Sequence, residues 1–351
     1  MILLLVLLLA ALLGFTAHSA GICAVKAVSE IITTRRTHML ASFGKTALWI
    51  LTAMMVVMWL APNREMSMLL APSLASIAGA FLFGIGAALN GGCAISTVTR
   101  LGNGEIRMLL TITGVALAIA VIDGELLTFP ALSKSQTVRP FVIGGWALRL
   151  AVAALLSWAV WETIGLWRKR DPTCGLLEGV LHRRWRLSVA AAVIGLANAA
   201  IALAAGHWAY TGTLRDFVGS RIAGRMTPSV LHLGLFAALM AGVIASALLR
   251  RSYALRCRPK REWLRNLVGG MLMGVGIVTV PGGNDGLLLD AIPSLSPHAI
   301  PAFAGLLVGI ATVLLMLPRI SDVRGIECGG DICRDIPGSG VAQSTIFRNT
   351  C

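Results

Sequence analysis

Between positions 83 and 93 the chain reads Phe83-Gly84-Ile85-Gly86-Ala87-Ala88-Leu89-Asn90-Gly91-Gly92-Cys93, with a cysteine directly after a Gly-Gly pair. The stretch lies inside an uncharged segment that runs over residues 66–99. A similar pattern returns in the second half as Met273-Gly274-Val275-Gly276, followed by Pro281-Gly282-Gly283-Asn284. Two glycine-interrupted apolar segments in corresponding halves of a chain indicate a membrane transporter whose site lies at the breaks.

The composition places the rest of the chain in a membrane. Of its 351 residues, 56% are hydrophobic and 13% are charged, and the mean hydropathy is +0.80. A soluble domain carries about 25% charged residues, and a membrane-spanning helix needs about 20 apolar residues. The sequence therefore predicts an all-α integral membrane protein with about nine spans, the third and eighth of them broken. The predicted spans are residues 1–25, 46–63, 66–99, 108–122, 146–161, 187–214, 226–249, 266–284 and 291–318.

The distribution of positive charge predicts the orientation. The net charge is +14, but 23 of the 30 Lys and Arg residues fall on one side of the membrane if nine spans alternate, and six fall on the other. The positive-inside rule then puts the N-terminus outside and the C-terminus in the cytoplasm. The expected location is a bacterial inner membrane. This arrangement argues against nucleic acid as a partner and for the lipid bilayer. The first span lacks the basic n-region of a signal peptide, which favours a retained helix over a cleaved one.

The two glycine-rich segments also predict a repeat. They are the third and eighth predicted spans, an odd offset of five, so the second copy runs in the opposite direction and is inverted about an axis in the membrane plane. An offset of 190 residues aligns Gly84 with Gly274, and after one inserted residue Cys93 corresponds to Asn284. The predicted organisation is a first transmembrane repeat (1–167), a basic cytoplasmic linker (168–186), a second repeat (187–318) and a cytoplasmic tail (319–351).

The breaks themselves predict an anion site. Unsatisfied backbone is costly in lipid, so a Gly-Gly interruption is tolerated where it is buried or lines a polar cavity. A short helix restarting at Ala94 or Asp285 would direct its backbone N–H groups into the gap and attract an anion. The alternative is that the glycines only allow close helix packing. Packing suits Gly79, Gly84, Gly270 and Gly274, whereas the pairs Gly91-Gly92 and Gly282-Gly283 favour broken helices.

Three stretches carry a family resemblance. They are residues 14–23, which end in Gly21-Ile22-Cys23; residues 83–93, followed by Arg100-Leu101-Gly102-Asn103-Gly104; and residues 265–274 with Gly282-Gly283-Asn284-Asp285. Over residues 1–318 the chain resembles the YeeE/YedE family of sulfur transport proteins, which includes the thiosulfate permeases. The resemblance implies an hourglass-shaped, all-helical inner-membrane permease. It also implies that thiosulfate crosses a narrow waist through successive S–H contacts with cysteines.

Carried over by residue, the resemblance makes Cys23 and Cys93 pathway thiols. A third cysteine of the family pattern is replaced here by Asn284, followed by Asp285. This departure leaves two thiols and puts a carboxylate on an anion's path, so a related sulfur species or a proton-linked step competes with thiosulfate itself. The simpler interpretation is that Asn284 and Asp285 cap the restarted helix.

Thiols suit such a path because they are polarizable and are weak donors and acceptors. Conduction needs binding that is strong enough for entry and weak enough for release. The alternative is that Cys23 and Cys93 are small buried hydrophobes. His18 and Ser19 precede Cys23 and are predicted to line the cytoplasmic half of the path, although a packed histidine explains His18 equally well.

Two further segments carry predictions. His207-Trp208-Ala209-Tyr210-Thr211 follows the sixth span and predicts an aromatic anchor at the outer interface. The tail contains Cys328, Cys333 and Cys351, for which a cytoplasmic location disfavours disulfides. One C-x4-C pair is a weak zinc signal, and the polar composition predicts a disordered tail. The alternative is that a tail thiol passes sulfur to a cytoplasmic sulfur-carrier protein.

No enzyme motif and no cofactor or metal motif occurs in a suitable context, so the chain is not expected to be an enzyme. Three hypotheses follow. The first is a permease for thiosulfate or a kindred small sulfur-containing anion, in which uptake depends on Cys93. The second is a channel or carrier for another small solute, in which Cys93 merely packs. The third is a membrane sulfurtransferase that forms a cysteine persulfide.

Overall fold

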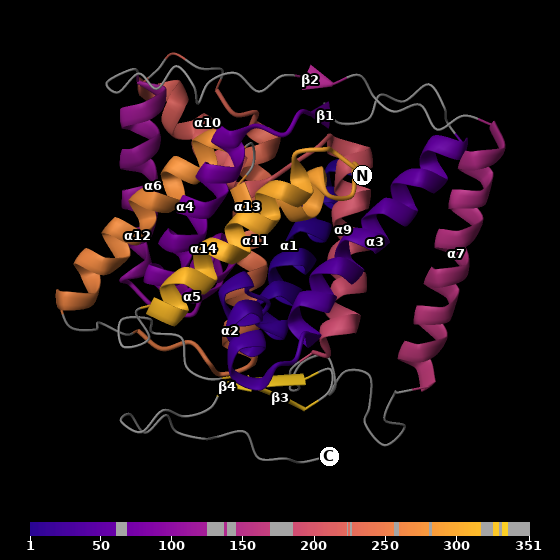
Figure 1. The fold of residues 1–351 in the computed structure, drawn as a ribbon, viewed down its shortest axis with the longest axis horizontal. Helices are drawn as coiled ribbons and strands as arrows, with labels where there is room; N and C mark the ends of the chain where they lie inside the picture. The colour runs from indigo at the N-terminus through magenta and orange to yellow at the C-terminus, as the bar shows by residue number, and fades with distance from the viewer. Residues whose placement is uncertain are drawn as a thin grey trace.

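The computed structural model describes residues 1–60, 69–124, 137–138, 145–168, 185–222, 224, 227–255, 260–280, 283–316, 326–329 and 332–335. Within these residues almost all regular structure is helical, and the helices stand side by side in one bundle (Figure 1). The predicted all-α fold class is confirmed. Gly282, the basic linker beyond Arg168 and the end of the tail lie outside the described residues.

One arrangement recurs along the described chain: a long helix, a short break, a short helix and a second long helix. The first unit is α1 (Ile2–Ala20), α2 (Ala24–Thr34) and α3 (His38–Leu60), and the second is α4 (Leu74–Asn90), α5 (Ala94–Gly102) and α6 (Met108–Asp123). After α7 (Gly145–Arg168) come α9 (Leu187–Ala205), α10 (Tyr210–Ile222) and α11 (Val230–Leu249). The last unit is α12 (Lys260–Thr279), α13 (Gly283–Gly286), the π-helix η1 (Leu287–Ala291) and α14 (Ala299–Met316).

The structure therefore contains more breaks than the sequence predicted. The expected interruptions follow α4 and α12, and further ones follow α1 at Gly21 and α9 at Gly206. Gly21 has φ 64° and Gly206 has φ 85°, a backbone conformation that glycine adopts without steric cost. These two positions were missed because a single glycine near the end of an apolar run is also an ordinary helix terminus.

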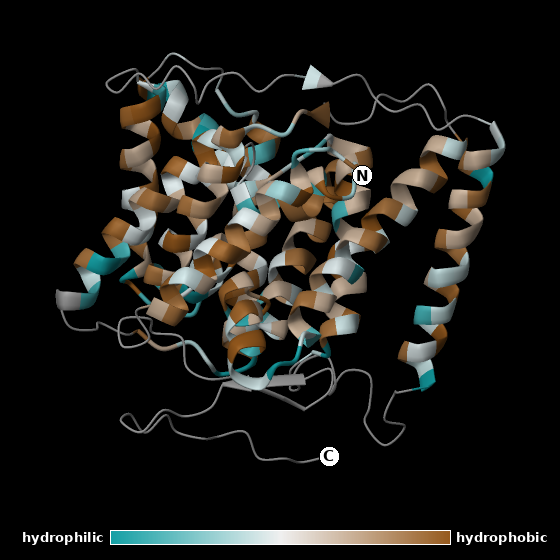
Figure 2. Ribbon diagram, viewed as in Figure 1, coloured by the Kyte–Doolittle hydropathy of each residue, from teal (hydrophilic) through white to brown (hydrophobic). Residues whose placement is uncertain are grey.

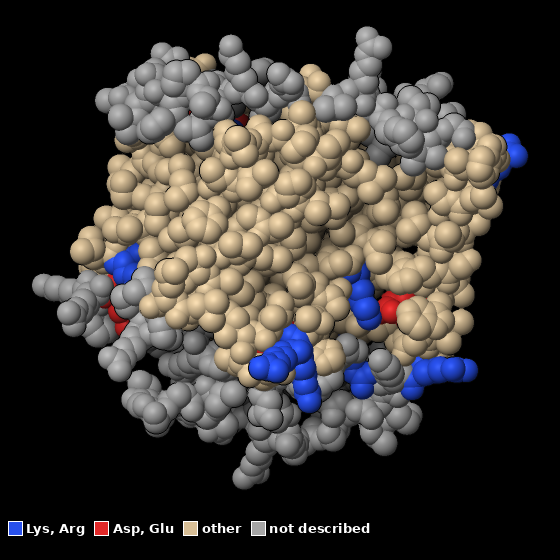
Figure 3. Space-filling view, viewed as in Figure 1, with Lys and Arg blue, Asp and Glu red and all other residues tan. Residues whose placement is uncertain are grey.

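Helix length and composition agree with a membrane location. Seven helical segments of the described chain are long and apolar enough to span a bilayer, and an eighth results if α12 and α13–η1, bent by 43°, form one span. The shorter apolar helix α6 accounts for the remaining predicted span. Apolar residues cover the sides of the bundle (Figure 2). In Figure 3 a wide uncharged band crosses the visible face, with most of the visible Lys and Arg side chains along its lower edge.

Glycines allow the closest helix contacts. A Cβ atom at Gly84 would lie 2.2 Å from the Leu306 carbonyl oxygen on α14, and one at Gly274 would lie 2.7 Å from the Val115 carbonyl oxygen on α6. In lipid the hydrophobic effect contributes little to the association of helices. Small residues stabilise the contact instead, because they let two backbones approach closely and pack. The predicted packing role is confirmed for these two glycines, and the same crowding is found at Gly79 and Gly270.

Short strands close the two ends of the bundle. At one end β1 (Leu69–Leu70) pairs antiparallel with β2 (Thr137–Val138). At the other, β3 (Ile326–Gly329) pairs antiparallel with β4 (Ile332–Asp335) and lies beside α2. The prediction of a disordered tail thus does not hold for these two segments. An isoleucine begins each strand and the dipeptide Gly-Asp separates them, a composition that favours a hairpin.

Candidate functional site

The same local geometry ends α1 and α4. Gly21 and Gly91 adopt left-handed backbone angles, with φ 64° and φ 75°, and terminate their helices. Two residues after each glycine, Cys23 and Cys93 take extended conformations and become the N-terminal caps of α2 and α5. The predicted restart at Ala94 is confirmed. Each break therefore places a cysteine at the N-terminus of a short helix.

The structure brings the two cysteines together. Cys23 and Cys93 are 1% and 0% exposed, and their side chains lie in hydrogen-bonding contact. Both are free thiols. Neither lies at the lipid surface, although the sequence placed Cys23 near the end of a span. The break in α1 explains the difference, because it stops the helix inside the bundle.

Backbone amides surround this thiol pair. The Cys23 thiol approaches the backbone N–H groups of Cys93 and Lys26, and the Cys93 thiol approaches those of Ala24 and Ser96. These are first-turn or cap amides of α2 and α5, which have no partner within their own helices. Two helix N-termini therefore meet at one point, and their partial positive charges favour an anion there.

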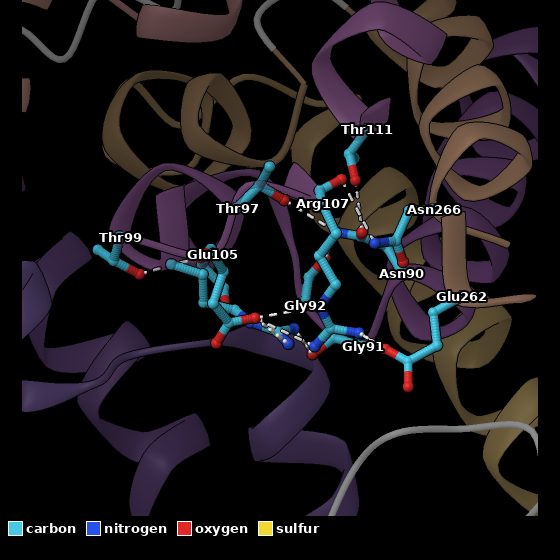
Figure 4. A network of polar contacts seen from close by, with 12 residues as sticks. Asn90, Gly91, Gly92, Thr97, Thr99, Glu105, Arg107, Thr111, Glu262 and Asn266 are labelled. Atoms are coloured by element: carbon cyan, nitrogen blue, oxygen red, sulfur yellow. Dashed lines mark hydrogen bonds and ion pairs between the residues drawn. The ribbon is translucent and has the colours of Figure 1, made fainter. Parts of the chain in front are cut away.

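The Asn90 side chain holds the break after α4 in place (Figure 4). Asn90 is fully buried, and its Nδ2 donates to the Gly92 carbonyl at 3.0 Å and to Thr97 Oγ1 at 2.9 Å. Its Oδ1 accepts from Thr111 Oγ1 on α6 at 2.7 Å. Thr97 also donates through its hydroxyl and its backbone N–H to the Cys93 carbonyl. Protein groups thus satisfy the interrupted backbone, as burial in a membrane protein requires.

A cluster of charged side chains lies beside this break (Figure 4). Arg100 donates to the Gly91 carbonyl at 3.3 Å and pairs with Glu105 at 2.8 Å. Arg107, whose side chain is 1% exposed, bridges Glu105 at 3.1 Å and Glu262 at 2.6 Å. The cluster connects α5 and α6 to the start of α12, so the position of the break depends on long-range ion pairs as well as on local turns.

The second half contributes a carboxylate at the corresponding break. Here α13 begins at Gly283, φ 56°, two residues before the expected Asp285. Asn284 and Asp285 are 4% and 3% exposed. The Asp285 carboxylate accepts hydrogen bonds from the Thr211 hydroxyl and, at 3.2 Å, from the Thr211 backbone N–H. The carboxylate also approaches the backbone N–H groups of Asp285 and Gly286 within α13, so it contacts the first turn of α10 as well as its own helix.

A narrow gap lies beside Asn284. It is lined by Phe83, Gly276, Gly283 and Leu306 among others, and it is too narrow to hold a water molecule. Among the described residues, Asn284 Oδ1 has no hydrogen-bond partner. The interior beside Asn284 is therefore closely packed, and among the described residues this oxygen is left available for a hydrogen bond.

The two aromatic rings after α9 are buried inside the protein, so their predicted role as an interface anchor is wrong. Trp208 is 6% exposed and donates through Nε1 to Thr213 Oγ1 at 3.0 Å, and Tyr210 is 4% exposed. The chain turns inward after Gly206, which directs both rings away from lipid. The burial of Tyr210 was not predicted, because aromatic residues that follow an apolar run are common at membrane interfaces.

His207 and Asp290 join the segment before α10 to η1. The ring Nδ1 lies 2.8 Å from Asp290 Oδ1, and this hydrogen bond raises the pKa of His207 above its usual value, with partial burial opposing the shift. A raised pKa means that the pair stabilises the fold below the unfolded-state pKa of about 6.5 and ceases to do so as pH rises through the folded-state pKa. Because both side chains are partly exposed, the effect is about 1 kcal/mol or less.

We therefore expect His207→Gln to lower the thermal stability of the purified protein at pH 5.5 and to leave it unchanged at pH 9. Thermal unfolding of both proteins across this range measures the difference. A His207→Gln effect that persists at pH 9 would show that the ring contributes by packing instead of by charge.

His18 and Ser19 lie in a separate polar cluster one turn before the break in α1. His18 Nδ1 and Ser19 Oγ each contact Ser246 Oγ on α11, at 2.9 and 3.0 Å. Ser19 and Ser246 are buried. The cluster connects α1 to α11, so a packing role for both residues accounts for all the contacts described here.

The arrangement suits transient binding of a soft anion. It offers S–H groups, backbone amides and neighbouring polar side chains. Within the described residues, no three His, Cys, Asp or Glu side chains gather as a metal site would require.

The comparison with known families agrees with this geometry. Residues 19–312 match the family model described as sulphur transport. The chain belongs to the sulphur transport family. It is also 25% identical over 251 residues, 63% of this chain and 68% of the relative, to the thiosulfate transporter TsuA of Escherichia coli (strain K12). The matched range includes both cysteines and all four breaks.

Membership of the sulphur transport family confirms the resemblance inferred from the glycine and cysteine motifs. Together with the apolar helices, it identifies the chain as a multi-pass membrane protein of sulphur transport. The two thiols and the Asn284–Asp285 break thus lie inside a transport fold.

Proposed function

We propose that this protein imports thiosulfate or a closely related sulfur-containing anion across the bacterial inner membrane, and that the substrate passes between Cys23 and Cys93. The observation that carries the proposal is the contact between the two buried thiols at the meeting point of two helix N-termini. The family match and the thiosulfate transporter among its relatives support the same substrate class.

The chemistry of the thiol pair supports transport over tight binding. A thiol donates a weak hydrogen bond and its sulfur is polarizable, so it can hold the terminal sulfur of the anion briefly. The α2 and α5 N-termini offset part of the anion's desolvation without supplying a full charge. Binding of this moderate strength permits both entry and release.

The second half of the path differs from the family pattern, and we propose that the difference modifies the substrate or the coupling. Asn284 occupies the position expected for a third thiol, and Asp285 follows it within the buried first turn of α13. An ionised Asp285 would repel a passing anion, whereas a protonated one would donate a hydrogen bond to it. A proton carried by Asp285 would therefore couple naturally to anion passage.

We also infer that residues 1–167 and 187–318 are inverted repeats, with the N-terminus outside and the C-terminus in the cytoplasm. Matched contacts between equivalent glycines support the repeat. A Cβ at Gly86 would lie 2.5 Å from the Gly269 carbonyl oxygen, and a Cβ at Gly276 would lie 2.8 Å from that of Gly79. Each half thus packs its broken helix, α4 or α12, against the other. The excess of Lys and Arg on one side supports the orientation.

Uptake of radiolabelled thiosulfate into proteoliposomes tests the function. We expect the wild-type protein to take up the label faster than protein-free liposomes, and unlabelled thiosulfate to compete. Lack of uptake by wild type would contradict thiosulfate as the substrate.

The variant Asn284→Cys restores the family's third thiol and should accelerate thiosulfate uptake by about tenfold if a missing thiol contact limits the rate. Wild-type inactivity combined with activity of Asn284→Cys would indicate that the native substrate is a different sulfur compound. An Asn284→Cys variant no faster than wild type would show that this position does not limit passage.

A further inference from the structure

The hydroxyl of Tyr210 is buried without a partner. Tyr210 is 4% exposed and begins α10, and among the described residues its OH makes no hydrogen bond. A buried polar group that lacks a partner costs free energy, so native proteins keep few of them, and a functional role is one of the recognised explanations. Phenylalanine would fill the same space with the same ring, so packing alone does not explain the hydroxyl.

The position of this hydroxyl relates it to the thiol pair. The phenol lies within electrostatic reach of Cys23, Cys93 and Asp285, and Tyr210 belongs to the same buried cluster as the two cysteines. Its neighbour Thr211 is already occupied, since its hydroxyl and backbone N–H both bind Asp285. Within the first turn of α10, the Tyr210 hydroxyl therefore offers a donor that remains available to a molecule beside the thiol pair.

The chemistry of the substrate class requires such a donor. Thiosulfate has one soft terminal sulfur and a group of hard oxygens. The thiols of Cys23 and Cys93 suit the sulfur, but a thiol is a poor donor to an oxyanion, whereas a phenolic O–H is a good one. Asn284 presents to its gap an unpartnered carbonyl oxygen, which accepts hydrogen bonds and does not donate them.

We propose that the Tyr210 hydroxyl is a specificity-determining residue, which donates a hydrogen bond to an oxygen of the sulfur anion while the terminal sulfur of that anion contacts Cys23 and Cys93. This inference rests on the proposed function and assigns the oxygen-bearing end of the substrate to α10. The replacement of the family's third thiol by Asn284 makes a hard donor at this point more important, because fewer soft contacts remain.

The test compares Tyr210→Phe with Tyr253→Phe, which alters the one other tyrosine of the chain, an exposed residue. For Tyr210→Phe we expect the KM for radiolabelled thiosulfate uptake to rise about tenfold or more, the usual consequence of losing a hydrogen bond to a charged ligand. We also expect the protein without substrate to keep or raise its Tm, because an unsatisfied hydroxyl has been removed. Tyr253→Phe should match wild type in both measurements.

Thermal unfolding with and without thiosulfate separates the outcomes. The rise in Tm that thiosulfate gives wild type should shrink in Tyr210→Phe and persist in Tyr253→Phe. A Tyr210→Phe protein with a wild-type KM and thiosulfate response would overturn the inference, as would one that loses several degrees of Tm without substrate. If wild type itself neither transports nor responds to thiosulfate, both the proposed function and this inference fail. If wild type transports, Cys93→Ala does not, and Tyr210→Phe is normal, only this inference fails.

Discussion

Replacing Cys93 with alanine is expected to reduce thiosulfate uptake by about 100-fold, to near the level of protein-free liposomes. Cys93 is fully buried, its thiol contacts Cys23, and its backbone begins α5. Alanine preserves the backbone but removes the S–H group and leaves Cys23 without its partner. Losing an interaction with a charged substrate costs about 1.5–3 kcal/mol, or about 10- to 100-fold, and here two thiol contacts are disrupted together.

Two further variants show which property of the thiol matters. Cys93→Ser keeps a hydrogen-bond donor of similar size but lacks a polarizable sulfur, so uptake that fails in both variants would identify softness as the requirement. Cys174→Ala is the matched control, because it removes a cysteine from the basic linker and should transport as wild type does. Wild-type uptake by Cys93→Ala would mean that Cys93 only packs and that the path or the solute is different.

Replacing Arg107 with methionine is expected to destabilise the protein by about 3 kcal/mol. The Arg107 side chain is 1% exposed and pairs with both Glu105 and Glu262. Removing one member of a buried ion pair leaves the other charges uncompensated in a region of low dielectric constant, which is costlier than losing a surface pair. Methionine fills a similar volume, so the loss of stability would come from the missing charge and not from a cavity.

Thermal or denaturant unfolding in detergent measures this effect. Arg221→Met is the matched control: Arg221 is exposed and stacks over Phe217 at 5.7 Å, a contact worth about 1 kcal/mol or less. The double variant Arg107→Met with Glu262→Gln should recover part of the loss, because one of the uncompensated carboxylates is neutralised. Equal stability of Arg107→Met and wild type would show that the charged cluster beside the α4–α5 break is not needed to hold the break in place.

Much of the fold followed from local chemistry. Uncharged runs of about 20 residues predict membrane helices whatever their neighbours. The Gly91-Gly92 pair predicted a helix end, and Gly91 indeed has the left-handed angle that glycine alone adopts freely. The predicted restart at Ala94 is confirmed, with Cys93 at the N-cap position of α5 although its side chain makes no capping hydrogen bond. Gly282 lies outside the described residues, so its predicted role in the second break stays a prediction.

Less of the site could be predicted. Cys23 and Cys93 were chosen as separate pathway residues, but their contact was not foreseen. His18 was considered equally suited to lining and to packing, and only the position of Ser246 on α11 favoured packing. Tyr210 was assigned to the membrane interface because its neighbours in sequence resemble an aromatic anchor. Its burial depends on an inward turn after Gly206, for which one glycine is a weak signal.

By itself, then, the sequence determined that this protein lies in a membrane, where its helices run and where two of them break, because those properties depend on residues within a few positions of one another. The tertiary structure decided that Cys23 meets Cys93, that Asp285 binds Thr211, and that the Tyr210 hydroxyl is buried near them with no hydrogen-bond partner among the described residues. These contacts join helices distant in sequence. Their positions depend on how glycine-rich surfaces pack across the whole bundle, which no local pattern encodes.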